Sequence, residues 1–287
     1  MRYRIGSSAR ADLPWAIVVG AGAMGVAIAR RLAQQNRVLI ADIHPDIAEQ
    51  KSALLREEGC DVRSIVCDVT SRDAVSELAA QVSELGGFSV LAHVAGLSPS
   101  LGDFQSIMRV NLRGMGLVIE ALLPHARRGS AAILIASLAA HNFTPADLAV
   151  AALNDATADT LVERLTSILG PSGATPQAAY VHSKWGVLAL ARRQSAQWAA
   201  SGARINSLSP GLIATTQGAL EFQNSAGKRR IFDMSPMRRE GTMLEIADAV
   251  EFLASPRASF INGTDLLVDG GLAAVLGQQS VERDLPS

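Results

Sequence analysis

The chain has 287 residues, of which 48% are hydrophobic and 18% are charged, and its formal net charge is −1. This composition predicts a folded protein with a large core, and it argues against a disordered chain and against nucleic acid as a partner. No apolar run reaches the length of a membrane span free of charge and glycine, so we expect no membrane partner. The two cysteines lack metal-site spacing, which predicts reduced thiols, no metal and a cytoplasmic location.

After a polar, aperiodic arm at residues 1–13, short apolar runs alternate with helical patterns. The predicted strands are Ala16–Gly20, Arg37–Asp42, Asp61–Cys67, Ser89–Val94, Ala132–Ser137, Arg204–Leu208 and Asp265–Val268. The predicted helices are 24–35, 45–58, 72–85, 105–127, 177–200 and 243–254. This alternation predicts a single α/β domain over 14–273, with a doubly wound parallel sheet of about seven strands, helices on both faces, and a tail at 274–287.

The first predicted strand runs into a glycine-rich turn and a helix, in the stretch "WAIVVGAGAMGVAIARRLA". Gly20, Gly22 and Gly25 form G-x-G-x-x-G, in which the glycines permit a tight turn, a close approach of the backbone to a pyrophosphate, and close helix–strand packing. Asp42 ends the second strand, where its carboxylate can accept hydrogen bonds from a ribose hydroxyl and would repel a 2′-phosphate. Because neither residue 43 nor residue 44 is Arg or Lys, we expect NAD rather than NADP. The alternative is a glycine turn without a ligand.

Two further strand ends carry polar or small residues. Asp68 follows the third strand, and "HVAG" (His93–Gly96) ends the fourth with small residues that would leave room for a cofactor. For His93 two interpretations stay open, a proton shuttle and a packed or hydrogen-bonded histidine.

The segment between Ala140 and Tyr180 is about 36 residues longer than a connecting loop requires. Thr144–Pro145 is typical of a helix start, with Thr as N-cap and Pro as the first helical residue. Apolar residues then follow at helical spacing until Gly170–Pro171, which predicts a stop. We therefore expect a helical insertion at about 141–176, too short to form a domain of its own.

Tyr180 precedes Lys184 by four residues in a predicted helix, which places both side chains on one face. An ammonium at that distance favours phenolate over phenol and would lower the pKa of the tyrosine from its usual value of about 10. Such a pair suits proton transfer in alcohol–ketone chemistry. The alternative is a helix that carries one Tyr and one Lys without a joint role.

Taken in this order, these motifs resemble the short-chain dehydrogenase/reductase family, a family with the Rossmann fold, over about residues 14–273. The resemblance implies that Tyr180 is the acid/base, that Lys184 lowers its pKa, that Ser137 binds the substrate oxygen and that Asn111 holds a water of the proton relay. The cofactor contacts that it implies are Gly20, Gly22, Ala23, Met24, Gly25, Asp42, Ile43, Asp68, Val69, Val94, Ala95, Gly96, Tyr180, Lys184, Pro210, Gly211, Ile213 and Thr215.

The chain departs from the family pattern in three places. The glycine turn is one residue shorter and carries Val19 where Thr is common, and Val94 replaces the second asparagine of the usual N-N-A-G. Ser137 and Tyr180 are 43 positions apart, where about a dozen is usual in the family. In this the chain is similar to hydroxysteroid dehydrogenase-like members with a helical insertion, which implies a homodimer, with a homotetramer as the alternative.

The expected function is an NAD(H)-dependent oxidoreductase that interconverts a secondary alcohol and a ketone. A substrate flap is predicted at about 214–241. Its apolar residues could line a pocket for a bulky apolar substrate, steroid-like or alicyclic, or instead pack the flap onto the domain; they are Leu220, Phe222, Ile231, Phe232, Met234 and Met237. The alternative functions are an acyl or polyketide ketoreductase and a non-catalytic NAD-sensing protein.

Overall fold

Seven parallel strands form the centre of the computed structural model, which describes residues 12–214 and 226–277. The strands are β1 (Trp15–Val19), β2 (Arg37–Asp42), β3 (Val62–Val66), β4 (Phe88–His93), β5 (Ala126–Ile135), β6 (Arg204–Pro210) and β7 (Asp265–Val268). Their order in the sheet is β3-β2-β1-β4-β5-β6-β7. The predicted α/β class and doubly wound sheet are confirmed, and most strand bounds differ from the prediction by one or two residues.

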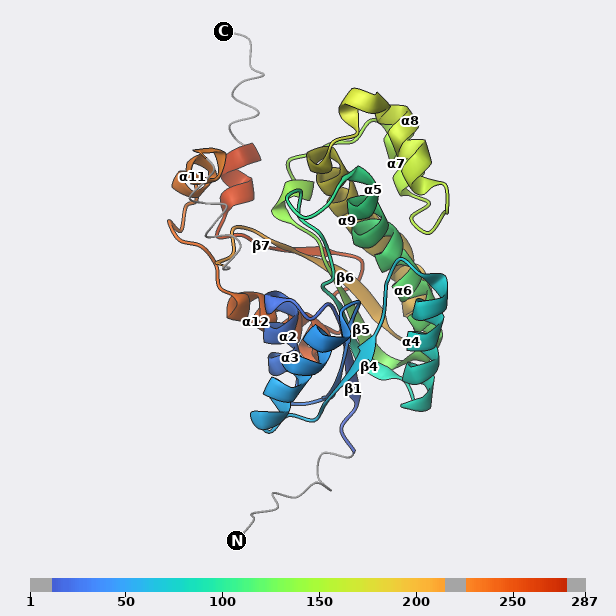
Figure 1. Ribbon diagram of the computed structural model, residues 1–287. Coiled ribbons are helices and arrows are strands. Elements are labelled where there is room, and N and C mark those ends of the chain that lie inside the picture. Colours follow the sequence, from blue (N-terminus) through green and yellow to red (C-terminus); the bar gives the residue numbers. More distant parts are fainter. Residues whose placement is uncertain (1–11, 215–225, 278–287) are drawn as a thin grey trace.

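Helices cover both faces of this sheet (Figure 1). One face carries α2 (Ala23–Leu32), α3 (Pro45–Glu57) and α12 (Met243–Ala254), and the other carries α4 (Arg72–Glu84), α5 (Phe104–Met108), α6 (Met115–Leu122) and α9 (Pro176–Ala200). Side chains alternate between the faces along each strand. In β1, Ala16 and Val18 join the core under α2 and α12, whereas Ile17 and Val19 join the core on the α9 side. The central strands β1, β2, β4, β5 and β6 are therefore largely buried from both sides, whereas the edge strands β3 and β7 are only partly buried.

The helix predicted over 105–127 is divided into four pieces. Between α5 and α6 lies η1, a π-helix at Arg109–Gly114, and the 3-10 helix η2 (Leu123–His125) follows α6. Gly114 packs closely against the loop after β3, since a Cβ there would lie 2.7 Å from the Val69 side chain. A π-helical segment inside an α-helix is often found at functional sites, and this one contains Asn111.

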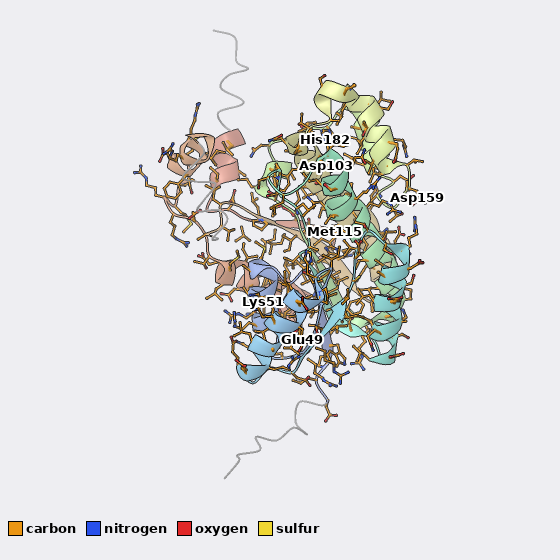
Figure 2. All side chains as sticks on the ribbon, in the orientation of Figure 1. Glu49, Lys51, Asp103, Met115, Asp159 and His182 are labelled. Carbon is orange, nitrogen blue, oxygen red and sulfur yellow. The ribbon has the colours of Figure 1, made fainter. Side chains whose placement is uncertain are left out.

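Two helices, α7 (Asp147–Leu153) and α8 (Leu161–Gly173), lie in the segment predicted as a helical insertion, after the 3-10 helix η3 (Leu138–Ala140). The predicted start at Thr144 is wrong, because Ala146 is the N-cap of α7 and helical geometry begins at Asp147. The predicted break at Gly170 is present as a kink with φ of 70°, after which one more turn follows. Arg72 donates to the Thr157 carbonyl at 2.9 Å and Arg113 pairs with Asp159 at the outer edge of the molecule (Figure 2), so this segment is fastened to α4 and η1.

The remaining described helices are α11 (Ala226–Asp233) and the 3-10 helix η4 (Pro256–Ala258). The two ends of the predicted flap meet, because Ile213 and Gly241 form a parallel bridge and Ala214 donates to the Gly241 carbonyl at 2.8 Å. Leu220 and Phe222 of the flap lie outside the described residues. Among the helices that the structure describes, none combines the length and the apolar character needed to cross a membrane.

Candidate functional site

A cavity of about 940 Å³ opens at the carboxyl ends of the parallel strands. Ligands of open α/β sheets bind at this edge, where the strand order reverses direction, here between β1 and β4. Most of the predicted cofactor and catalytic residues line the cavity: Gly20, Gly22, Ala23, Met24, Gly25, Asp42, Ile43, Asp68, Val69, Val94, Ala95, Gly96, Ser137, Tyr180, Lys184, Pro210, Gly211 and Ile213. Asn111 lies behind this lining, and Thr215 lies outside the described residues.

The glycine turn shows three different reasons for glycine. Gly20 has a φ of 107°, and a Cβ there would lie 2.7 Å from the Ala95 nitrogen. A Cβ on Gly25 would lie 1.9 Å from the Gly20 carbonyl oxygen, so this glycine lets α2 pack against the turn. A Cβ on Gly22 would meet no atom of the described chain within 4 Å, so packing inside the protein does not require glycine there. Gly22 instead leaves space on the cavity side, at the uncapped N-terminus of α2, where free N–H groups suit a phosphate.

Two carboxylates are held at the same edge by backbone N–H groups. Asp42 Oδ2 accepts from the Ala21 nitrogen at 2.7 Å and Oδ1 accepts from the His44 nitrogen at 2.9 Å. Asp68 Oδ1 accepts from the nitrogen and the hydroxyl of Thr70, at 2.9 and 2.8 Å. These bonds fix the direction of each carboxylate, which is the pre-organisation that recognition of a ligand hydroxyl needs.

Tyr180 and Lys184 lie on α9, which begins with Thr175 as N-cap and Pro176 as the first helical residue. The Lys184 Nζ lies 5.9 Å from the centre of the Tyr180 ring, and it donates to the Ile135 carbonyl at 2.9 Å. Ser137, the second residue after β5, shares a hydrogen bond with the Tyr180 hydroxyl. The structure thus brings together three of the four residues predicted to be catalytic, at one end of the cavity.

Burial sets the protonation states of this group. Burial raises the pKa of Tyr180, and the hydrogen bond from Ser137 only partly opposes it. Burial also lowers the pKa of the Lys184 ammonium, to about 8. The expectation of a Tyr180 pKa below its usual value is therefore wrong for this structure, because the desolvation of the phenolate is the larger effect, and the influence of Lys184 on that pKa stays a prediction. Tyr180 is a phenol at neutral pH, which makes it a proton donor.

Asn111 is fully buried and joins two parts of the site. Its Oδ1 accepts from the Leu97 nitrogen at 2.7 Å, and its Nδ2 donates to the Leu97 carbonyl at 2.9 Å and to the Ser183 hydroxyl at 3.3 Å. Ser183 in turn donates to the Tyr180 carbonyl at 2.9 Å. The side chain of Asn111 therefore fastens the loop after β4 to α9, and its predicted role toward a water stays a prediction.

His93 ends β4 and is completely buried. Among the described residues, neither ring nitrogen has a hydrogen-bond partner. Burial, and then the charge of Lys184, lower the pKa of His93 to about 3, so the imidazole is neutral at physiological pH. The interpretation of His93 as a packed or hydrogen-bonded histidine agrees with this burial, and its role as a proton shuttle stays a prediction.

Sequence reasoning missed several residues of the cavity wall. Leu97 and Ser98 follow "HVAG" directly, and Val110 precedes Asn111, so adjacency to the motifs was an available signal. Glu240 and Met243 come from the end of the flap and from α12, and no local pattern indicates them. Among the described flap residues, Ile231, Phe232, Met234 and Met237 do not line this cavity, and Met237 is exposed; whether they pack the flap onto the domain stays a prediction.

No group of three or more His, Cys, Asp or Glu side chains in the described ranges could hold a metal ion. The polar groups at the cavity include instead glycine backbone, the three carboxylates of Asp42, Asp68 and Glu240, hydroxyls and the ammonium of Lys184. This set fits a dinucleotide, because it offers N–H groups to phosphate at α2 and carboxylate oxygens to sugar hydroxyls at β2.

Known proteins share both the sequence and the fold. A family model described as "Enoyl-(Acyl carrier protein) reductase" matches residues 20–175 and 162–273. The chain is 31% identical to short-chain dehydrogenase/reductase bsc3 of Alternaria brassicicola, over 92% of this chain and 97% of that protein. It is 32% identical to galactitol 2-dehydrogenase (L-tagatose-forming) of Cereibacter sphaeroides, over 91% and 96%. A structure of a variant of actinorhodin polyketide ketoreductase with NADPH has the same fold, with a TM-score of 0.70 and 24% identity over 92% of this chain and 98% of that one.

Proposed function

The chain belongs to the short-chain dehydrogenase/reductase family, and on that premise we propose that it interconverts a secondary alcohol and a ketone with NAD(H). The observation that carries this proposal is the meeting of Tyr180, Ser137 and Lys184 at one end of a cavity whose other walls fit a dinucleotide. A serine hydroxyl, a phenol and an ammonium that meet in this way suit proton transfer, which favours an enzyme over a protein that only senses NAD.

Different residues at the cavity would bind different parts of the cofactor. Of the residues that line the cavity, Gly22 at the N-terminus of α2 would hold the pyrophosphate, Asp42 would hold the adenosine ribose, and the segment Pro210–Ile213 would border the nicotinamide. When bound, the dinucleotide supplies the acceptor or donor of hydride. The cavity volume of about 940 Å³ is at the upper end of the usual range for ligand pockets, which leaves room for a substrate beside it.

The protein's own residues handle the proton. Tyr180 donates its phenolic proton to the oxygen of a ketone, or as phenolate accepts the proton of an alcohol. Ser137 holds the same oxygen and stabilises charge that develops on it. Lys184 compensates the phenolate with its ammonium, which the Ile135 carbonyl holds in place. Asn111 keeps the loop after β4 and α9 together, so that these groups stay aligned.

NAD is proposed over NADP because of the charge at the end of β2. The Asp42 carboxylate is fixed by two backbone N–H groups, and the next two residues, Ile43 and His44, offer no Arg or Lys. A 2′-phosphate at this place would meet an anion at short range. The ketoreductase compared above is a structure with NADPH, but that likeness concerns the fold alone.

For the substrate we propose a bulky, largely apolar alcohol or ketone. Leu97, Val110 and Leu212 add apolar surface to the cavity beside the polar group of Ser137 and Tyr180. Apolar walls with a few placed polar groups are typical of sites for such ligands. Turnover of a panel of alicyclic, steroidal and aliphatic secondary alcohols measures this preference directly.

Tyr180→Phe tests the proposal, because it removes only the hydroxyl that carries the proton. We expect kcat/KM to fall by about a thousandfold or more with NAD⁺ and an accepted alcohol, since a general acid/base contributes about 10²–10⁴. Binding of NADH, measured by fluorescence titration, should stay within about threefold, because the wall provided by the ring remains.

Tyr3→Phe is the matched control, since Tyr3 is the only other tyrosine of the chain. It should leave turnover at the wild-type value. Near-normal turnover by Tyr180→Phe would overturn the assignment, and loss of NADH binding in the same variant would show that Tyr180 acts on the cofactor rather than on the proton.

A further inference from the structure

His93 occupies a position under the proposed proton relay. In the sheet it pairs with Val19 of β1 and Leu134 of β5. Leu91, two residues earlier on the same face, belongs to the core under α9, as do Val19 and Leu134. The imidazole therefore points toward α9 and η1, the elements that carry Lys184 and Asn111.

Lys184 reaches down to this same layer. Its Nζ donates to the carbonyl of Ile135, the residue that follows Leu134, the direct sheet partner of His93. Three residues after His93, a Cβ on Gly96 would lie 3.5 Å from the Lys184 Nζ and 3.2 Å from Asn111 Oδ1. Lys184 is also the charged group whose electrostatic effect acts on His93. The end of β4 thus lies next to the ammonium.

The hydrogen-bonding capacities of the two groups complement each other. An ammonium has three donors, and the structure shows one acceptor for it, the Ile135 carbonyl. A neutral imidazole has one donor and one acceptor nitrogen, and the described residues offer His93 a partner for neither. A leucine would fill the same space without leaving polar atoms unpaired in the core, so packing alone does not explain a histidine here.

We propose that His93 is a positioning residue of the proton relay, whose neutral imidazole accepts a hydrogen bond from the Lys184 ammonium across one bound water. This link stabilises the Lys184 ammonium on the side that faces the sheet. Of the three N–H groups of the ammonium, one donates to the Ile135 carbonyl, one to the water, and the third is left for the cavity. The inference deepens the proposed function and rests on it, because an ammonium needs such support only if it must stay charged beside a phenolate.

The first test reads the pKa of Lys184 directly and needs no substrate. The chain has three lysines, Lys51, Lys184 and Lys228, so a protein labelled with ¹³C at lysine Cε gives a spectrum of three signals. Lys51 lies on α3, across the sheet from α9 (Figure 2), and serves as an internal reference. Lys184→Arg identifies the signal of Lys184 by its loss.

In His93→Leu we expect the Lys184 midpoint to move down by about 0.5–1 pH unit, because the ammonium loses an acceptor. His93→Gln, which keeps an acceptor, should restore at least half of the shift. The matched control is Ser52→Ala on α3, which also removes a fully buried polar atom without a partner among the described residues. It should leave the midpoint in place. An unchanged Lys184 midpoint in His93→Leu, with the fold intact by circular dichroism, overturns the inference.

The second test uses the pH profile of alcohol oxidation. If the Lys184 ammonium is less stable, the phenolate of Tyr180 is less favoured. The rising part of the plot of kcat against pH, which reports deprotonation of Tyr180, should therefore move to higher pH in His93→Leu and stay in place in Ser52→Ala. A uniform drop in kcat without movement of this rising part would indicate a merely structural His93 and would overturn the inference. Failure of the proposed function would look different: Tyr180→Phe would keep its activity, whatever the Lys184 signal does.

Discussion

At the scale of single residues, desolvation rather than pair attraction governs the proposed acid/base group. Burial moves the pKa of Tyr180 upward and that of Lys184 downward to about 8, so the structure holds a phenol and an ammonium at neutral pH. This state is ready for proton donation to a ketone. The reverse reaction needs phenolate, and alcohol oxidation therefore gains from alkaline pH.

The carboxylate of Asp42 gives a prediction at the same scale. Asp42→Asn keeps an oxygen that accepts from the Ala21 nitrogen but removes the negative charge. We expect the ratio of kcat/KM for NAD⁺ over that for NADP⁺ to fall by about tenfold or more, since repulsion of a 2′-phosphate is lost. Steady-state kinetics with both cofactors measures this ratio.

Asp68→Asn is the control for that experiment, because Asp68 lines the same cavity but is bonded to Thr70 at the end of β3. It should change the two kcat/KM values together. Equal ratios in wild type and Asp42→Asn would contradict the proposed cofactor preference.

Motif residues were predictable from sequence because their chemistry depends on local spacing. The glycine turn, Asp42, and the pair Tyr180 and Lys184 all lie at the predicted cavity. The lack of a hydrogen-bond partner for His93 among the described residues was not predictable, since it depends on packing between strands and helices far apart in the sequence. The predicted direction of the Tyr180 pKa shift was wrong for the same reason, because the spacing of four residues between Tyr180 and Lys184 does not indicate how deeply the tyrosine is buried.

At the scale of elements, the turn between β1 and α2 contains one glycine that packing requires, Gly25, and one that we propose serves binding, Gly22. Gly25→Ala would place a Cβ 1.9 Å from the Gly20 carbonyl oxygen, whereas Gly22→Ala meets no atom of the described chain within 4 Å. We expect Gly22→Ala to keep the wild-type Tm and to bind NADH at least about tenfold more weakly, because its methyl group enters the pyrophosphate space. Gly25→Ala should lower the Tm by several degrees.

Differential scanning fluorimetry and NADH titration on the two variants check this pair. Equal losses of Tm in both would contradict the assignment of Gly22 to the ligand. If Gly22→Ala had both a normal Tm and a normal affinity for NADH, the proposal that the pyrophosphate binds at this turn would be wrong.

Element types were predictable from periodicity, and their interruptions were not. The helix pattern over 105–127 gave no sign of the π-helix at Arg109–Gly114, nor of the close approach of its last residue, Gly114, to Val69. Thr144–Pro145 has the residues of a helix start, yet α7 begins at Asp147. Capping preference is weak compared with the tertiary packing of Ala149, Ala152 and Leu153, which decides where this helix lies.

At the scale of the whole molecule, the buried histidine connects the site to pH-dependent stability. The folded protein keeps His93 neutral down to a pKa of about 3, whereas the unfolded chain takes up a proton near the ordinary value of 6.5. Stability from this group is thus fully present above about pH 6.5 and is lost as the pH falls toward 3. Lys184 is charged in both states below pH 7 and does not contribute in this window.

Urea unfolding at pH 7 and pH 5 measures the effect. Between these values the wild type should lose about 2 kcal/mol more free energy of unfolding than His93→Leu. Ser52→Ala should follow the wild type, since it leaves His93 in place. Parallel losses in wild type and His93→Leu would show that the imidazole is protonated in the folded state.

The strand order also determines the sequence in which parts of the protein can form during synthesis. Strands β1 to β4 are consecutive in the chain and contiguous in the sheet, as β3-β2-β1-β4. The glycine turn, Asp42, Asp68 and all residues of these four strands are therefore synthesised before any residue of β5. Until β5 is made, the edge of β4 that ends in His93 has no neighbour. The nascent chain thus contains the glycine turn, Asp42 and Asp68 before α9, which carries Tyr180 and Lys184, is made, and one strand edge is meanwhile open to wrong pairing.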